Sequence, residues 1–214
     1  MDFNKFLISL SKIKNIPLPG ESSQLKMSPP FRRELMEVYK DAKPHAKKAG
    51  VLALFYPDYQ HCTKLALILR KTYHGVHSAQ VGFPGGRYEV QDKTLKQTAL
   101  RETYEEIGVS INFIDVIQQM TEIYIPPSNF YVQPYMAITK SLPKFKKQDS
   151  EVEAIIEVPV SQLLDDRFVV NKSVMSSNGK LVNVPAYELC GHVVWGATGM
   201  MLSEIKELIK NIQL

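Results

Sequence analysis

Cysteine is scarce in this chain: Cys62 and Cys190 are the only two among 214 residues. They form no C-x-x-C pair, and two cysteines fall far short of the density that disulfide-stabilised secreted domains carry. A disulfide scaffold is therefore excluded. We expect a protein of a reducing compartment in which both cysteines are ordinary buried residues.

Long apolar runs are also missing, since no uninterrupted stretch approaches the roughly 20 residues that a membrane-spanning helix requires. The first residues carry Asp2 where a signal peptide has basic residues, and the last residues lack a peroxisomal Ser-Lys-Leu ending. The sequence therefore predicts a cytoplasmic protein without a membrane partner.

No charge of one sign dominates, because 26 Lys and Arg residues face 22 Asp and Glu residues for a formal net charge of +4. A small anionic substrate fits this balance, whereas no basic stripe with interleaved aromatic residues indicates a nucleic-acid partner. The basic run at Lys144, Lys146 and Lys147 is typical of a solvated turn rather than a phosphate clamp.

Repeats and low-complexity segments are absent too, and the composition is that of a globular domain. We expect an N-terminal helical extension over residues 1–45 and one main domain over residues 46–214. Apolar spacing predicts helices at residues 3–13, 31–41 and 197–212 and a helical turn at 160–164. Strands are predicted at 51–56, 64–69, 111–117, 121–125, 131–138 and 154–158. Strands mixed with helices in this order imply an α/β fold whose sheet is covered on both faces.

One further helix, predicted over residues 94–107, carries an unusual group of acids. Thr94 and Gln97 form a capping box at its start, and Gly108 is the glycine that commonly ends a helix. Glu105 and Glu106 follow Glu102 by three and four residues, so we expect the three carboxylates to share one face of the helix.

Three like charges repel, and a hard divalent cation relieves that repulsion, because Mg²⁺ prefers oxygen ligands and binds through carboxylates together with substrate phosphates. Arg101 is four residues before Glu105 and can pair with it and fix its orientation. Upstream, Gly85 and Gly86 leave room for a diphosphate to approach the backbone. The alternative, a solvated face of a surface helix, is the usual interpretation of an isolated E-x-x-E-E. The flanking arginine and glycines at fixed offsets favour the metal site.

The segment from Gly86 through Asp92, Arg101 and Glu102 to Val109 resembles the signature of the Nudix hydrolases, G-x5-E-x7-R-E-U-x-E-E-x-G-U with U aliphatic. It departs from that signature in three places: Asp92 replaces the first glutamate, the gap to Arg101 is one residue longer, and Thr103 occupies an aliphatic place. The resemblance implies an α/β/α sandwich with a mixed sheet. It also implies hydrolysis of a nucleoside diphosphate linked to another group, with Mg²⁺ or Mn²⁺ held by Glu102, Glu105 and Glu106.

The residues upstream are similar to the coenzyme A pyrophosphatase branch of that family, whose motif ends in F-P-G-G. This resemblance implies a substrate like coenzyme A, cut to adenosine 3′,5′-bisphosphate and 4′-phosphopantetheine or its acyl form. The substrate-binding residues that it implies are Arg70, His77, Gln80, Phe83, Gly85 and Gly86. Lys71, Gly75 and Ala79 depart from the branch motif, so a Nudix hydrolase of ADP-ribose or another nucleotide sugar remains an alternative.

A carboxylate outside the acidic helix often assists in this family as a base or an extra ligand. Our candidate is Glu153, which we place on a loop before the strand at 154–158, with an ordinary surface acid as the alternative. Together with Arg101 and Glu105 it completes the predicted catalytic group. A module that binds a nucleotide without cleaving it is a further alternative, which the retained acids disfavour. The expected partner is a small-molecule nucleoside diphosphate, and a homodimer is one assembly that stays open.

Overall fold

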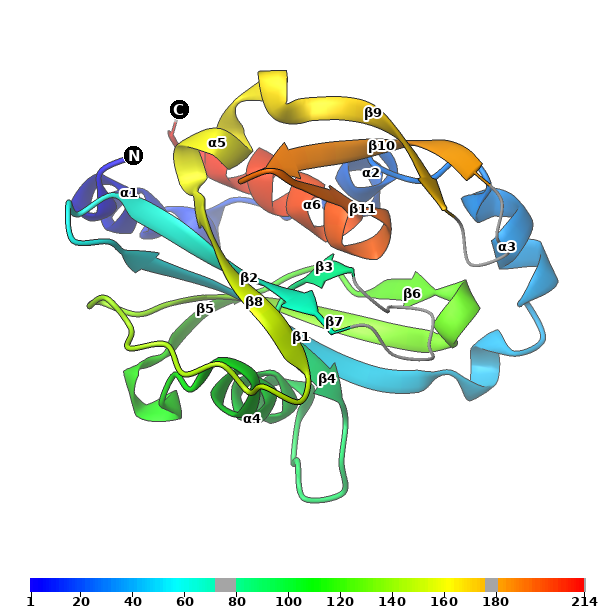
Figure 1. The fold of residues 1–214 in the computed structure, drawn as a ribbon, viewed down its shortest axis with the longest axis horizontal. Helices are drawn as coiled ribbons and strands as arrows, with labels where there is room; N and C mark the ends of the chain where they lie inside the picture. The colour runs from blue at the N-terminus through cyan, green and yellow to red at the C-terminus, as the bar shows by residue number, and fades with distance from the viewer. Residues whose placement is uncertain (72–79, 176–180, 214) are drawn as a thin grey trace.

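A mixed eight-stranded sheet runs through the centre of the molecule (Figure 1). The structure, a computed structural model, describes residues 1–71, 80–175 and 181–213. The strands are β1 (Lys47–Pro57), β2 (Thr63–Arg70), β3 (Val81–Gly82), β4 (Gly85–Arg87), β5 (Asp115–Gln119), β6 (Ile123–Ile125), β7 (Phe130–Ile138) and β8 (Val152–Pro159). The main path is β3-β2-β1-β7-β5, with β4 also on β1, β6 on β7 and β8 on β2. β1 and β7 pair in parallel and the other pairs are antiparallel, so the sheet is mixed, as predicted.

Helices cover both faces of this sheet, which gives the expected α/β/α layers. The acidic helix α4 (Leu95–Ile107) lies on one face, and the long C-terminal helix α6 (Gly196–Gln213) lies on the other (Figure 1). Alternate residues of β1 divide accordingly: Leu52 and Leu54 belong to the core on the α4 side, and Ala53 and Phe55 to the core on the α6 side. The alternation of side chains along a buried strand thus builds two cores.

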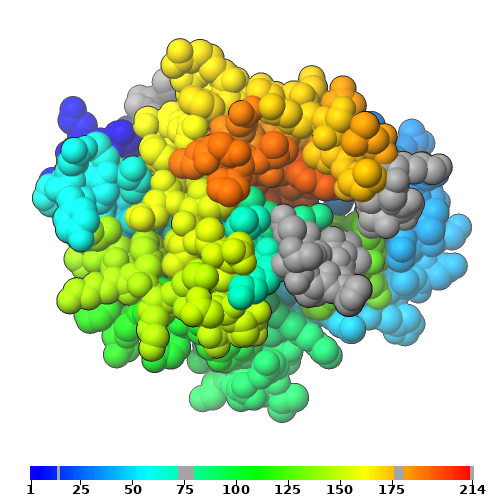
Figure 2. Space-filling view, in the orientation of Figure 1, coloured from blue at the N-terminus to red at the C-terminus, as the bar shows by residue number. Residues whose placement is uncertain are grey.

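A second, three-stranded antiparallel sheet was not predicted. It consists of β9 (Val169–Met175), β10 (Leu181–Leu189) and β11 (His192–Trp195) and follows α5 (Val160–Leu164) and a 3₁₀ turn, η5 (Asp166–Phe168). Its residues, yellow to orange, form the upper part of the face in Figure 2. β11 leads directly into α6, so the small sheet fixes where that helix begins.

The N-terminal segment packs against the same core as α6. It contains α1 (Phe3–Leu10), α2 (Gly20–Leu25) and α3 (Arg32–Val38), with 3₁₀ turns η1 (Ile13–Asn15) and η2 (Lys43–His45). Asp2 caps α1 by accepting a hydrogen bond from the Lys5 N–H. α2 was not predicted, and its Ser23 hydroxyl donates to the Ser203 carbonyl of α6 at 3.1 Å. The proposed division at residue 45 stays a prediction.

Two expectations were wrong. The strand predicted at 111–117 begins as a 3₁₀ turn, η3 (Ile111–Phe113), and becomes β5 only at Asp115. The cysteines are not buried: Cys62 is half-buried and Cys190 exposed, because both lie where strands turn. Another 3₁₀ turn, η4 (Pro126–Ser128), lies between β6 and β7. Among the described residues, no helix is long and apolar enough to cross a membrane.

Helix α4 is held at both ends and along its length. Thr94 accepts from the Gln97 N–H at its start, and Gly108 adopts φ 74° at its end, as the sequence predicts. The backbone N–H of Gln148 donates to the Glu106 carbonyl at 2.9 Å, so the loop before β8 is hydrogen-bonded to the last turn of α4. At Gly50 of β1 an added Cβ would collide with the Leu95 carbonyl oxygen, which shows how closely the helix lies on the strand.

Candidate active site

Arg101 lies at the centre of the acidic helix and forms hydrogen bonds with three acids. Its Nε and Nη2 atoms donate to the two oxygens of Asp92, both at 3.0 Å. Its Nη1 atom donates to Glu102 at 2.8 Å and to Glu105 at 2.9 Å, the latter being the predicted i, i+4 pair. The Asp92 side chain is only 4% exposed. The hydrogen bonds from Arg101 lower the pKa of Asp92 to about 2, against the opposing effect of burial. Asp92 is therefore the fixed anchor of the arginine.

Glu106 is the most buried acid of the helix, with 1% of its side chain exposed. It accepts hydrogen bonds from the Gly85 N–H at 2.7 Å and from Arg70 Nη1 at 2.9 Å. Burial raises the pKa of Glu106 to about 7, and the charges of Glu102 and Glu151 act in the same direction. Arg70 and the Gly85 N–H oppose that rise without cancelling it. A nearby cation would favour the charged form.

Glu102 lies one helical turn before Glu106 and is 14% exposed. Its carboxylate rests against Gly86, where an added Cβ would lie 2.5 Å from the Glu102 carboxyl carbon. Burial raises the pKa of Glu102, while the ion pair with Arg101 lowers it. A glycine at position 86 therefore makes room for this carboxylate.

Glu105 differs from the other two acids. Successive helical residues are about 100° apart, so Glu105 is rotated that far from its neighbour Glu106 and points toward solvent. Its side chain is 52% exposed, and it forms an ion pair with Arg101. The three acids therefore occupy one side of the helix unequally, with Glu102 and Glu106 inward and Glu105 outward.

A fourth acid, Glu151, comes close to the inward pair. Its charge raises the pKa values of both Glu102 and Glu106, by less than burial and less than the charge of a neighbouring glutamate. Its carbonyl accepts from the Lys71 N–H at 2.9 Å, which holds the chain beside the end of β2. Glu153, our sequence-based candidate, lies in strand β8 rather than on a loop, at an irregularity in the pairing with β2. Sequence reasoning missed Glu151 because two exposed glutamates two residues apart look alike without the register of the strand.

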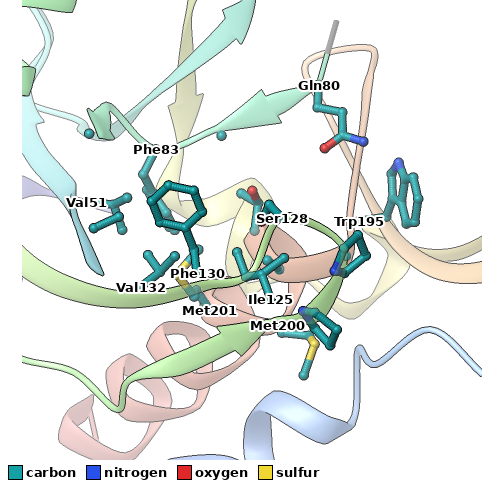
Figure 3. A pocket seen from close by; sticks show the side chains of 18 of the residues that line it. Val51, Gln80, Phe83, Ile125, Ser128, Phe130, Val132, Trp195, Met200 and Met201 are labelled. Carbon is teal, nitrogen blue, oxygen red and sulfur yellow. The ribbon is translucent and has the colours of Figure 1, made fainter. Parts of the chain in front are cut away.

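A cavity of about 410 Å³ opens next to these acids. Arg70, Gly85 and Gly86 line one end of it, and Gln80 and Phe83 belong to the same wall. The other walls come from elements far apart in the sequence, namely residues 29–35, residues 125–132 and residues 195–201. Figure 3 shows Ser128 between Phe83 and Trp195 in this view, with Met200 and Met201 below. The lining is largely apolar.

The comparison with known domains decides the family. The NUDIX domain model matches residues 44–177, which is more than half of the chain. The chain belongs to the Nudix family.

Relatives and solved structures agree with this assignment. A peroxisomal coenzyme A diphosphatase of Caenorhabditis elegans is 33% identical over 119 residues, covering 55% of this chain and 51% of that protein. The mitochondrial Nudix hydrolase 15 of Arabidopsis thaliana is 30% identical over 141 residues, covering 64% of this chain and 48% of that protein. The chain thus spans about half the length of these curated relatives. The Nudix hydrolase RenU of Mycobacterium smegmatis shares the fold, with a TM-score of 0.55 and 15% identity over 79% of this chain and 89% of that one.

Nudix hydrolases generally use divalent metal ions, and the donor set here suits a hard cation. Glu102 and Glu106 offer carboxylate oxygens only, and burial has raised the pKa of each, so a divalent cation would remove an electrostatic cost. Within the described parts of the chain, however, no three such side chains converge into a ready-made cage. A cation that keeps several waters and shares substrate oxygens fits this arrangement better than one that needs a complete protein shell.

The residues that we predicted for the Nudix substrate site divide into two groups. Arg70, Gln80, Phe83, Gly85 and Gly86 line the cavity. Arg70 is engaged by the protein, since its Nη2 atom donates to the Gly85 carbonyl at 2.7 Å besides the contact with Glu106. His77 lies outside the described residues. The sequence did not reveal the cavity-lining residues of the N-terminal segment, because helical spacing there indicated packing and nothing more.

Proposed function

We propose that this Nudix protein hydrolyses the diphosphate linkage of coenzyme A or its derivatives with the help of Mg²⁺ or Mn²⁺. The observation that carries the proposal is the shared wall between the acids and the cavity. Gly85 donates to Glu106, Gly86 makes room for Glu102, and both glycines line the cavity. A diphosphate that lies along these glycines would be held beside the two carboxylates. The F-P-G-G segment and the similarity to a coenzyme A diphosphatase support the choice of substrate.

In this proposal, side chains of the protein bind the cation and orient the substrate. Glu102 and Glu106 hold the divalent cation, and Arg101, anchored on Asp92, keeps Glu102 in place. Arg70 donates to Glu106 and lines the cavity, and its remaining guanidinium donors would bind diphosphate oxygens there. When bound, a divalent cation neutralises diphosphate oxygens and lowers the pKa of a coordinated water.

We further propose Glu151 as the acid that assists from outside the helix. Its charge acts on both Glu102 and Glu106, which supports a role for Glu151 beside these two acids. Glu153 provides a matched control, since both glutamates are exposed and lie two residues apart. If Glu151 assists, E151Q lowers turnover about 100-fold while E153Q changes it less than threefold, the usual range for general acid–base catalysis being about 10²–10⁴. The reverse ranking would restore Glu153 as the candidate.

The decisive experiment is metal-dependent hydrolysis of a panel containing coenzyme A, ADP-ribose and a dinucleoside polyphosphate. We expect release of adenosine 3′,5′-bisphosphate from coenzyme A with Mg²⁺ or Mn²⁺, none with a chelator, and none from the Glu106→Gln variant. Cleavage of ADP-ribose alone would move the assignment to the alternative substrate class. If the wild type cleaves nothing but binds a nucleotide, the non-catalytic alternative gains.

The cellular compartment and the oligomeric state of the protein are also proposals. We propose a cytoplasmic protein, although one relative is named as peroxisomal. Fractionation of cells that express the untagged chain tests this location, and light scattering of the purified chain tests whether it forms a homodimer.

A further inference from the structure

Among the described residues, Arg32 has no acidic hydrogen-bond partner, and it lies at the end of the cavity opposite the acids. It begins helix α3 and lines the cavity together with Phe31 and Leu35. Its Nη2 atom donates to the carbonyl of Tyr124 at 2.9 Å. No other hydrogen bond and no ion pair of this side chain occurs among the described residues. A guanidinium carries five N–H donors, so most of them remain available.

Arg32 is half-buried, and its surroundings do not neutralise its charge. Burial lowers the pKa of Arg32, and the charge of Glu21 on α2 opposes this only in part. A charge in such a place is costly unless a partner completes its hydrogen bonds. If the residue served only to attach α3 to the Tyr124 carbonyl, a neutral donor would do so without that cost.

A second polar group in the same wall lacks a partner. The hydroxyl oxygen of Ser128 in η4 is buried, and within the described part of the chain it has no hydrogen-bond partner. Ser128 lines the cavity, and Figure 3 shows it among apolar neighbours. Two lysines add positive charge near η4. The Nζ atom of Lys47 lies 5.9 Å from the centre of the Phe130 ring, and that of Lys43 lies 5.7 Å from the centre of the Tyr124 ring.

Strand β1 gives the separation between this end and the acids. Val51 pairs with Gly85 at the acidic end, and Lys47 pairs with Phe130 next to η4. Four residues of extended chain, at about 3.3 Å each, span about 13 Å. This is the scale of one nucleoside, so a group on the ribose of a substrate can reach the Arg32 end while its diphosphate lies at Gly85 and Gly86.

We propose that Arg32 binds a phosphate monoester carried by the nucleoside half of the substrate, as the 3′-phosphate of coenzyme A is. The inference rests on the proposed function, which supplies the position of the diphosphate. A phosphate dianion accepts hydrogen bonds from the open guanidinium donors and replaces the part of its hydration that the half-buried Arg32 has lost, and the Ser128 hydroxyl supplies a further donor. The N-terminal helix α3 thereby selects between nucleotides with and without the additional phosphate.

The test compares coenzyme A with dephospho-coenzyme A, which lacks only that phosphate. For the wild type we expect kcat/KM to be about 10- to 100-fold higher for coenzyme A, the range of one charge-assisted contact. R32A should bring this ratio close to one, and R32K should keep part of it. Arg33, exposed on the same helix and absent from the cavity wall, is the matched control, and R33A should keep the ratio of the wild type.

The outcomes separate this inference from the proposed function. If the wild type cleaves both compounds equally, or R32A retains the preference, the Arg32 inference is wrong and the hydrolysis of coenzyme A stands. If the wild type cleaves neither, the proposed function is wrong, and calorimetry still tests Arg32. Adenosine 3′,5′-bisphosphate should then bind at least tenfold more tightly than AMP to the wild type but not to R32A. Equal binding would overturn the inference. R32K guards against misfolding, because it retains the charge and the stem of the side chain.

Discussion

The anchor of the acidic helix can be tested by replacing Asp92 with asparagine. The Asp92 carboxylate accepts four hydrogen bonds. Two come from Arg101, one from the Thr98 hydroxyl at 2.9 Å and one from the Glu89 N–H at 3.0 Å. Asparagine keeps the shape of the side chain but lacks the charge that Arg101 requires. The substitution therefore removes the ion pair with little change in volume.

The pKa of Asp92 gives the expected change in the free energy of unfolding. It falls from 3.8 to about 2, and at about 1.4 kcal/mol for each pKa unit the charged form contributes about 2 kcal/mol to folding. Because the folded-state pKa is lowered, this contribution is present above pH 3.8 and is lost as the pH falls toward 2. We expect D92N to unfold with a free energy about 2 kcal/mol below that of the wild type at pH 7. The difference should shrink below pH 3.8.

Urea unfolding at pH 7 and at pH 3 measures both effects. Asp115→Asn is the matched control, since Asp115 is 58% exposed and faces Lys140 at 3.4 Å, and exposed ion pairs contribute little. A D92N protein as stable as the wild type at pH 7 would refute the reasoning. So would a difference that grows as the pH falls.

Three further predictions concern the helix and its neighbours. Burial raises the pKa of Glu106 from 4.5 to about 7, so in a chelator the wild type should lose up to about 3 kcal/mol of unfolding free energy between pH 4.5 and 7, whereas E106Q should not. Gly50→Ala should cost about 1–3 kcal/mol in urea unfolding, because the new methyl group overlaps the Leu95 carbonyl. Gly86→Ala should leave the melting temperature nearly unchanged, since the Glu102 side chain can move aside, but should lower turnover at least tenfold in the coenzyme A assay.

Local rules made α4 predictable. Thr94 and Gly108 fix its ends through contacts within the helix and its adjoining residues, and the spacing of the acids depends only on the helical repeat. The pairing of Arg101 with Glu105 follows from the same repeat. The inward and outward positions of the acids do not, because they depend on the face that α4 turns toward β1 and on the room left by Gly86.

The remaining differences come from long-range contacts. Helix α2 is short and begins at Gly20, and its Ser23 and Gln24 make their bonds to α6, 180 residues away. Strand β9 contains no buried residue, and Pro185 interrupts the sequence pattern of β10, which hid the small sheet. Arg32 gave no signal in the sequence, because its cavity exists only after the N-terminal helices have packed on the sheet.

The cavity walls also have a consequence for how this enzyme family can diversify. The match to the NUDIX domain covers residues 44–177. Arg32 precedes that range, and Trp195 and Met200 follow it, although all three line the cavity. Part of the cavity wall therefore lies outside the stretch of chain that carries the acids. Exchange of the flanking segments between related proteins should transfer the part of the substrate preference that we propose for Arg32, with the cleavage chemistry left in place.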